Sequence, residues 1–79
     1  MKAMLTKKDL VYGVSLTTGL TGDTASAAVT AVFDTITNGF RSGRGVSIRN
    51  FGKFELREDG GGRKVVTFTE SSNLMEGAQ

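Results

Sequence analysis

The sequence predicts an α+β fold in which two N-terminal helices lie under a three-stranded antiparallel sheet, followed by a short C-terminal helix. Three observations predict this fold. Apolar residues recur at three- and four-residue steps over the first half of the chain, the spacing then changes to strict alternation, and glycine-rich turns separate the later segments. The whole chain, residues 1–79, is expected to form one domain because it is short.

The first helix is predicted at residues 7–18. Thr6 stands at the N-cap position, and Asp9 follows three residues later, which is the arrangement of a capping box with Asp in place of Glu. Gly19 follows the last predicted helical residue and is expected to end the helix.

The second helix is predicted at residues 22–42, where the helical periodicity is clearest. The apolar residues from Ala25 to Phe40 recur at three- and four-residue steps and form one wide apolar face. Arg41 favours the negative end of the helix dipole, and Gly43 suits a left-handed cap.

Three strands are predicted after the second helix. They cover residues 46–49, 52–58 and 63–69, and a tight hairpin at residues 59–62 joins the last two. Ser71 or Ser72 is expected to cap a short terminal helix that contains Leu74 and Met75.

The composition excludes several classes of function. The chain has no cysteine and no histidine, so disulfides, thiolate nucleophiles and the usual metal ligands are absent. We therefore expect no enzyme activity, no cofactor and no metal. The lack of cysteine fits a reducing cytoplasm. Residues 1–6 contain no apolar run that could serve as a signal peptide, so none is expected, and no segment is apolar enough to span a membrane.

The small size and the uneven charge suggest what the chain binds. A domain of 79 residues without a disulfide or metal buries little surface, so dimerisation is expected. The net charge is only +2, but the basic residues are concentrated between residues 41 and 64. A concentrated basic stretch points to a polyanionic partner.

Strand alternation places the basic residues on one face of the predicted sheet. The apolar face is expected to cover the helices and carries Val46, Ile48, Phe54 and Leu56. The opposite face carries Ser47, Arg49, Lys53, Glu55 and Arg57. This second face is either a solvated outer surface or a surface that faces phosphates, and the excess of cations favours phosphates.

Two other patterns carry less weight. The run Gly43–Gly45 resembles the start of a dinucleotide-binding loop, but it leads from a helix into a strand, the reverse of that motif. Asp9, Asp23 and Asp34 lack metal-ligand spacing, so capping or surface roles are expected for them.

Five segments together resemble the HU/IHF family of bacterial histone-like proteins. They are Leu5–Leu10, Thr18–Thr21, Ala27–Ile36, Gly45–Glu58 and Lys64–Phe68. The fourth is similar to the family signature V-x-I-R-G-F-G-x-F-x-x-R, with Asn50 at the first glycine, and the fifth to K-V-P-A-F. The resemblance implies an intertwined dimer that binds DNA in the bacterial nucleoid, encoded by a bacterium or a phage.

The chain departs from the family at the long arm. Family members carry a β-ribbon that enters the minor groove, where a proline at its tip kinks the duplex. Here residues 59–62 replace that arm, the chain has no proline, and Thr69–Ser72 stand where basic residues usually follow the last strand. The resemblance therefore implies DNA binding by the body alone, with little or no kinking.

The expected function is weak binding of double-stranded DNA without sequence preference. The residues expected to contact DNA are Lys7, Ser47, Arg49, Lys53, Arg57 and Arg63. The residues expected to form the dimer core are Phe33, Phe40, Phe54 and Phe68. Helix N-termini near Thr6 and Ser71 are a second place where phosphate could bind.

Two alternatives stay open. The chain could dimerise with a full-length HU/IHF subunit, or join an assembly, without binding DNA itself. It could also be an artificial or degenerate armless form that keeps only the fold. The acidic residues of the tail favour the protein-interaction role.

Overall fold

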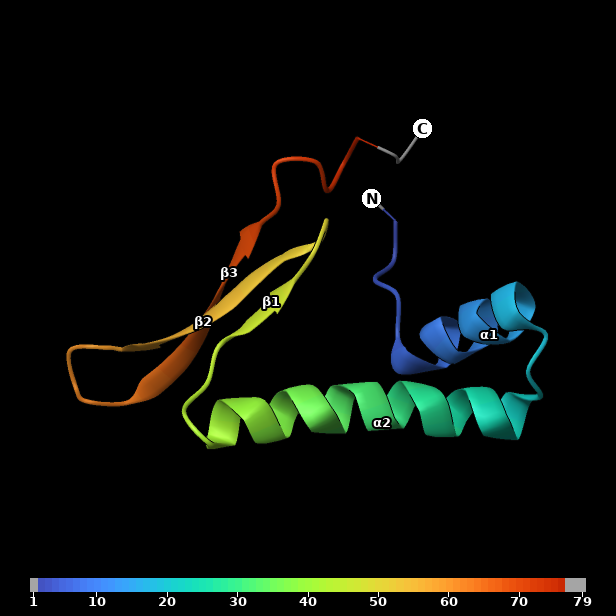
Figure 1. Ribbon diagram of the computed structural model, residues 1–79, viewed down its shortest axis with the longest axis horizontal. Helices are drawn as coiled ribbons and strands as arrows, with labels where there is room; N and C mark the ends of the chain where they lie inside the picture. Colours follow the sequence, from blue (N-terminus) through green and yellow to red (C-terminus); the bar gives the residue numbers. More distant parts are fainter. Residues whose placement is uncertain (1, 77–79) are drawn as a thin grey trace. The chain divides into compact units, whose positions relative to one another are not determined.

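The chain divides into two compact units, residues 1–35 and 36–79, and the computed structural model describes residues 2–76 (Figure 1). The elements follow in the order α1, α2, β1, β2, β3. This order confirms the two helices and the three-stranded sheet that the change of hydrophobic period predicts. The prediction that the whole chain is one domain stays a prediction.

Helix α1 spans Lys7–Thr18, as the sequence predicts. Its N-terminus has a complete capping box: the Thr6 amide donates to Oδ2 of Asp9 at 2.9 Å, and the Asp9 amide donates to the Thr6 hydroxyl at 3.4 Å. The box satisfies amides that a helix start otherwise leaves unpaired. Gly19 ends the helix in the left-handed region at φ 78°, which glycine adopts without a Cβ penalty.

Helix α2 spans Gly22–Arg41, one residue shorter than predicted. The Thr21 hydroxyl accepts a hydrogen bond from the Thr24 amide at 3.3 Å, so Thr21 caps the helix start. Ala25 and Val29 are the two buried apolar residues of the described chain. Two small side chains are a minimal core, and most of the wide apolar face of α2 is uncovered in a single chain.

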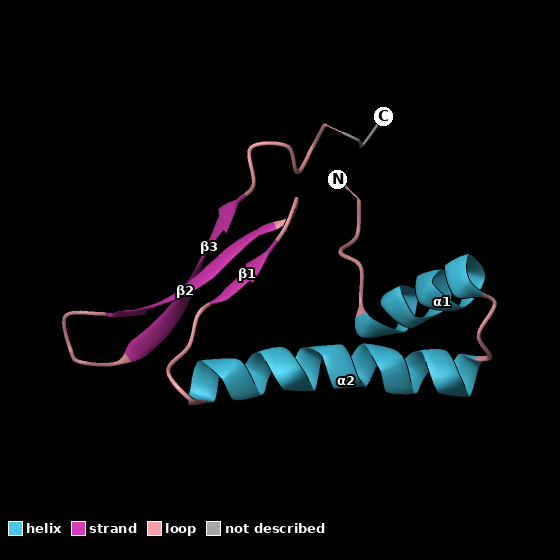
Figure 2. Cartoon of the chain, in the orientation of Figure 1, coloured by secondary structure: helices cyan, strands magenta, loops and turns pink. Residues whose placement is uncertain are grey.

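The sheet is an antiparallel meander of β1 (Val46–Ile48), β2 (Gly52–Glu58) and β3 (Lys64–Glu70), in the order β1-β2-β3 (Figures 1 and 2). β2 has its predicted bounds, β3 is displaced by one residue, and β1 ends at Ile48. Arg49 therefore lies in the β1–β2 turn and not in a strand, which corrects the sequence-based placement. The turn begins there because Phe51 donates its amide to the Ile48 carbonyl at 3.0 Å.

One face of the sheet carries a cluster of phenylalanine rings. Phe54 lies at the centre, with its ring centroid 4.8 Å from Phe68, 6.1 Å from Phe40 and 6.3 Å from Phe51. These separations are typical of favourable aromatic pairs. The cluster attaches the last turn of α2, through Phe40, to the sheet.

The exposure of these and other aromatic side chains is high for residues of their size. Phe33 is 46 % exposed, Phe51 43 % and Phe68 45 %. Fully burying such a ring stabilises a protein by about 1.5–3 kcal/mol, and here much of that gain is not realised within one chain. That Phe33, Phe40, Phe54 and Phe68 form a dimer core stays a prediction.

Gly52 lies where two strands approach closely. It begins β2 and pairs with both Ile48 and Glu70. A Cβ at this position would lie 2.5 Å from the Thr69 carbonyl oxygen and 2.6 Å from the Phe68 ring. Only glycine fits here without a shift of β3.

The predicted C-terminal helix is wrong for the described residues. Residues 72–76 form turns, with the Leu74 amide bonded to the Ser71 carbonyl and the Glu76 amide to the Asn73 carbonyl. The Ser71 hydroxyl bonds to the Asn73 side chain and also accepts from the Asn73 amide. Such local side-chain bonds compete with a helix, and a segment this short lacks the length to overcome them.

Candidate nucleic-acid interface

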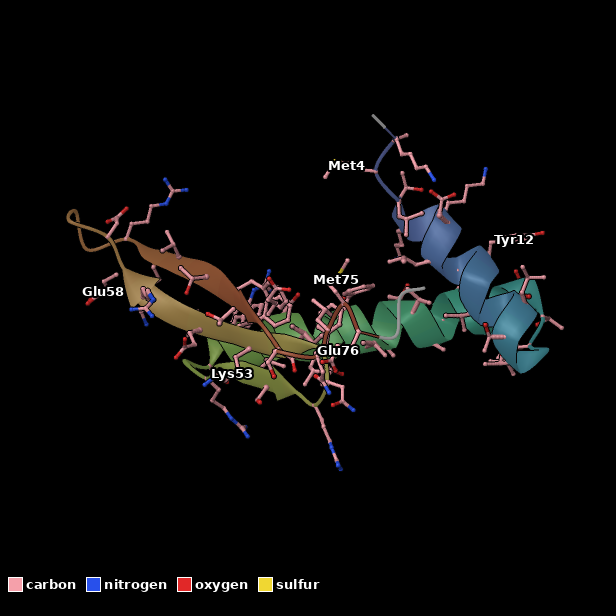
Figure 3. All side chains as sticks on the ribbon, turned by 90° about the horizontal axis from the view of Figure 1, so that it is seen from above. Met4, Tyr12, Lys53, Glu58, Met75 and Glu76 are labelled. Atoms are coloured by element: carbon pink, nitrogen blue, oxygen red, sulfur yellow. The ribbon has the colours of Figure 1, made fainter. Side chains whose placement is uncertain are left out.

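The face of the sheet opposite the phenylalanine cluster carries the predicted cations. Strand pairing arranges its side chains in three rows that cross the sheet. The rows are Ser47–Lys53–Thr69, then Glu55–Thr67, then Arg57–Val65. Neighbouring strands lie about 4.8 Å apart, so each side chain is within reach of the next one in its row. The side chains of this region, with Lys53 labelled, are drawn in Figure 3.

Arg57 is engaged by its neighbours on the sheet. Its Nε donates to the Thr67 hydroxyl at 3.2 Å, and its Nη2 lies 3.7 Å from Oε1 of Glu55. Both charged side chains of this pair are about half exposed or more, so the pair itself contributes little to stability, about 1 kcal/mol at most. Its consequence is electrostatic, because Glu55 offsets the positive charge of Arg57.

Arg49 stands on a turn that the C-terminal segment holds in place. Asn50, the next residue, has φ 64°, a left-handed conformation that asparagine tolerates better than most residues. Its Oδ1 accepts a hydrogen bond from Nδ2 of Asn73 at 2.8 Å, and the Phe51 carbonyl accepts one from the Ser71 amide at 2.9 Å. A left-handed residue is therefore accommodated where the family signature has its first glycine.

A shallow hollow of about 240 Å³ lies at this end of the sheet. Its lining includes the first row and the turn: Ser47, Ile48, Arg49, Asn50, Gly52, Lys53, Thr69, Glu70 and Ser71. The hollow brings two cations and three hydroxyl groups together with one carboxylate. The cations and hydroxyl groups are those expected of a surface that binds an anion, whereas the carboxylate opposes one.

The β2–β3 hairpin is short and organised by one carboxylate. Oδ1 of Asp59 accepts hydrogen bonds from the amides of Gly61 at 2.9 Å and Arg63 at 3.0 Å. The Asp59 amide in turn donates to the Arg63 carbonyl at 2.9 Å, which closes the loop. The glycine-rich segment is thus a defined tight turn, and it does not extend the two strands into a longer ribbon.

The predicted DNA-contacting residues fall into three places. Ser47, Lys53 and Arg57 share the outward face of the sheet, and Arg49 lies beside them on the turn. Arg63 lies in the hairpin at the other end of the sheet. Lys7 belongs to the other unit, in the exposed first turn of α1.

The hydroxyl groups of β3 are functional candidates that were not predicted from the sequence. Thr69 pairs directly with Lys53, and Thr67 bonds to Arg57. The signal was available, because a tight hairpin at residues 59–62 fixes which β3 residue lies opposite each β2 residue. Within the described residues, no group of three or more acidic side chains could hold a metal ion.

Comparison with known proteins identifies the family. The sequence profile of the family described as "Bacterial DNA-binding protein" matches residues 5–67. The chain belongs to this family, the HU/IHF proteins. Membership agrees with the prediction that the chain is not an enzyme. No helix in the described part of the chain is long and apolar enough to span a membrane.

Individual relatives agree with this assignment. The chain is 44 % identical over 54 residues to DNA-binding protein HU of Geobacillus stearothermophilus. This alignment covers 68 % of this chain and 60 % of that protein. HU of Streptococcus gordonii is 42 % identical over 55 residues, with 70 % and 60 % covered. The match thus spans about three fifths of the length of these relatives.

Solved structures share the fold. A variant of HU from Thermotoga maritima superposes with a TM-score of 0.80 at 28 % identity, covering 95 % of this chain and 100 % of that one. Anabaena HU from a cocrystal with DNA superposes with a TM-score of 0.76 at 24 % identity, covering 94 % and 97 %. These similarities confirm the two helices and the antiparallel sheet as an HU fold.

Proposed function

We propose that this chain is a DNA-binding protein of HU type that binds duplex DNA without sequence preference. The observation that carries this proposal is the outward face of the sheet, where Lys53 and Arg49 lie beside the hydroxyl groups of Ser47 and Thr69. Cations placed in this way neutralise phosphates and release counterions, which requires no contact with base edges. The DNA cocrystal of the Anabaena relative supports the choice of DNA as the ligand.

The proposed binding species is an intertwined homodimer. Among the residues that the structure describes, a single chain buries two small apolar side chains, while Phe33, Phe51 and Phe68 each stay more than two fifths exposed. Pairing of two chains through these rings would supply the missing core and would present two cationic faces to one duplex. The expected place of action is the bacterial nucleoid, for a protein encoded by a bacterium or a phage.

The bound DNA is expected to stay nearly straight. Bending a duplex costs several kcal/mol, which extra contacts around the DNA must offset. The Asp59–Arg63 turn is closed by its own hydrogen bonds and supplies no ribbon, and the chain has no proline to insert between base steps. Contacts are therefore limited to the body of the dimer.

A salt titration with a dye-labelled duplex tests this proposal. About four to six phosphate contacts per dimer predict that log affinity falls against log salt with a slope of about −4 to −5. Affinity at physiological salt is expected to be about micromolar or weaker. Energy transfer between dyes at the two duplex ends should report little bending. A sharp bend, or affinity that does not respond to salt, would contradict the proposal.

The alternative is a regulatory subunit that pairs with a full-length HU/IHF protein, or joins an assembly, and does not bind DNA. Glu70 at the end of β3 and Glu76 after the sheet favour this alternative, since carboxylates there repel phosphates. It predicts no DNA binding by the homodimer even at low salt. Co-purification with a full-length family member would then identify the partner.

A further inference from the structure

The outward face of the sheet is not uniformly cationic. Its middle row holds a carboxylate, Glu55, and a hydroxyl, Thr67. Arg57 in the next row reaches back to both of these side chains. The charges of Glu55 and Arg57, in the two rows nearer the hairpin, therefore offset each other. The Nε donor of Arg57 is already bonded to Thr67, and its Nη2 lies beside the Glu55 carboxylate.

The row at the other end of the sheet contains no carboxylate, and its cation has no partner among the described residues. In the described part of the chain, the side chains of Lys53 and Arg49 form no ion pair and no hydrogen bond. Lys53 is flanked across the sheet by Ser47 on one side and Thr69 on the other, and all three side chains are exposed. An exposed ammonium between two hydroxyl groups offers three donor groups to an anion and has no carboxylate in its own row.

The hollow beside this row has room for a phosphate group. Its volume of about 240 Å³ is many times the roughly 10–15 Å³ that a site needs, on the same measure, to hold one water. Ser47, Arg49, Lys53 and Thr69 all line it. Glu70 lines it as well, and its carboxylate is the group that opposes an anion there.

We propose that the row Ser47–Lys53–Thr69, together with Arg49, is the site that holds the phosphodiester backbone, and that Arg57 is a positioning residue of the sheet. This inference rests on the proposed function and assigns it to one end of the face. The Lys53 ammonium pairs with one phosphate, and the neighbouring hydroxyls donate to its oxygens or to those of the next phosphate. Arg49 lies on the turn that the Asn50–Asn73 bond holds, and its guanidinium approaches the same DNA strand.

Two matched pairs of variants test the site. Lys53→Gln is compared with Arg57→Gln, since both remove one cation from β2. Thr69→Val is compared with Thr67→Val, since both remove one hydroxyl from β3 and keep the shape of the side chain. Affinity for a duplex of about 20 base pairs is measured by anisotropy over a salt series, with sedimentation and circular dichroism to show that each variant is folded as the wild type is.

The two cation variants are expected to differ clearly in the slope of log affinity against log salt. Each lost phosphate contact reduces the salt slope by about 0.9, so Lys53→Gln should reduce it by about 1.8 in a dimer. Arg57→Gln should reduce it by less than half as much. Affinity of Lys53→Gln at low salt should fall at least about tenfold, because the lost bond is charge-assisted.

The hydroxyl pair provides an independent readout. Thr69→Val should weaken binding about threefold to tenfold, as expected for one lost hydrogen bond per site. Thr67→Val should stay within about twofold of the wild type. In the same assay, Glu70→Gln should bind more tightly than the wild type, since it removes the carboxylate from the hollow.

The outcomes separate this inference from the function on which it rests. If the wild type binds the duplex and Arg57→Gln loses as much slope as Lys53→Gln, the assignment of the site is wrong while DNA binding stands. Equal affinities for Thr69→Val and Thr67→Val would also overturn the assignment. If the wild type does not bind at low salt, the proposed function itself fails and the site falls with it.

Discussion

Replacing Gly52 by alanine should destabilise the protein through a backbone clash that the structure locates to one strand pair. A Cβ at Gly52 would lie 2.5 Å from the Thr69 carbonyl oxygen and 2.6 Å and 2.7 Å from two atoms of the Phe68 ring. Ordinary contact begins near 3.4 Å. The start of β2 and the end of β3 must therefore separate by close to an ångström, because backbone cannot move aside as a flexible side chain can.

The expected cost combines two effects. Overpacking of this kind costs about 1–3 kcal/mol, and a weakened ladder hydrogen bond at the Gly52–Glu70 pair adds about 1 kcal/mol. A total of about 2–4 kcal/mol should lower the melting temperature by at least about 8 °C in a domain of this size. The displacement of Phe68 would also disturb the phenylalanine cluster, since its ring lies 4.8 Å from that of Phe54.

Thermal unfolding followed by circular dichroism measures this effect. All samples need the same protein concentration, because the melting temperature of a dimer depends on it. Gly60→Ala is the matched control: no atom lies within 4 Å of the Cβ it would add. The control should melt within about 2 °C of the wild type, as surface substitutions usually do. If Gly52→Ala also melted within that range, the close approach of the two strands would be refuted.

Five further predictions concern other parts of the molecule. Sedimentation at micromolar concentration should give twice the chain mass of 8.4 kDa, and Phe68→Ala should cost about 3–5 kcal/mol in chemical denaturation if the ring is buried between two chains; a stable folded monomer would contradict both. Thr6→Ala should cost about 1 kcal/mol in the same denaturation, because it removes the capping box of α1. Gly13→Ala should raise stability by about 0.5–1 kcal/mol, since Gly13 lies within α1 with open space around it; a lower melting temperature would show that another chain covers it. Glu55→Gln should tighten DNA binding because it frees Arg57 from its ion pair. Arg57→Gln should then cost more affinity in the Glu55→Gln background than in the wild type, and equal losses in both backgrounds would show that the two residues are not coupled.

The sequence predicts the helices and strands well because their determinants are local. Thr6 and Asp9 form a capping box from adjacent turns, and Gly19 ends α1 by its own conformational freedom. Alternation likewise identifies β2 without knowledge of its partners. The predicted C-terminal helix is absent for a reason that is also local. Ser71 and Asn73 form side-chain hydrogen bonds with each other that compete with a helix, and hydrophobic periodicity does not reveal such bonds.

The site could be predicted only in part. Alternation places Lys53 and Arg57 on one face, but the two residues differ in what lies beside them on β3. Whether Arg57 is free or engaged depends on the register that puts Thr67 within reach and on the rotamer that turns toward Glu55. Neither property belongs to a single segment of the sequence, so composition alone overstates the number of free cations on this face.

The closed hairpin allows the loop between β2 and β3 to change in length while the sheet stays the same. The ends of the loop meet at the Asp59–Arg63 hydrogen bonds, so a segment inserted between Gly60 and Gly61 would leave and re-enter the fold at almost the same point. Each doubling of a flexible loop costs only about 0.6 kcal/mol, so even a long insertion is thermodynamically cheap. Ribbons of different lengths can therefore be inserted or deleted at this hairpin during evolution without substitutions in β2 and β3. Ribbons grafted there one at a time would let DNA bending be assigned to the ribbon, with this chain as the common background.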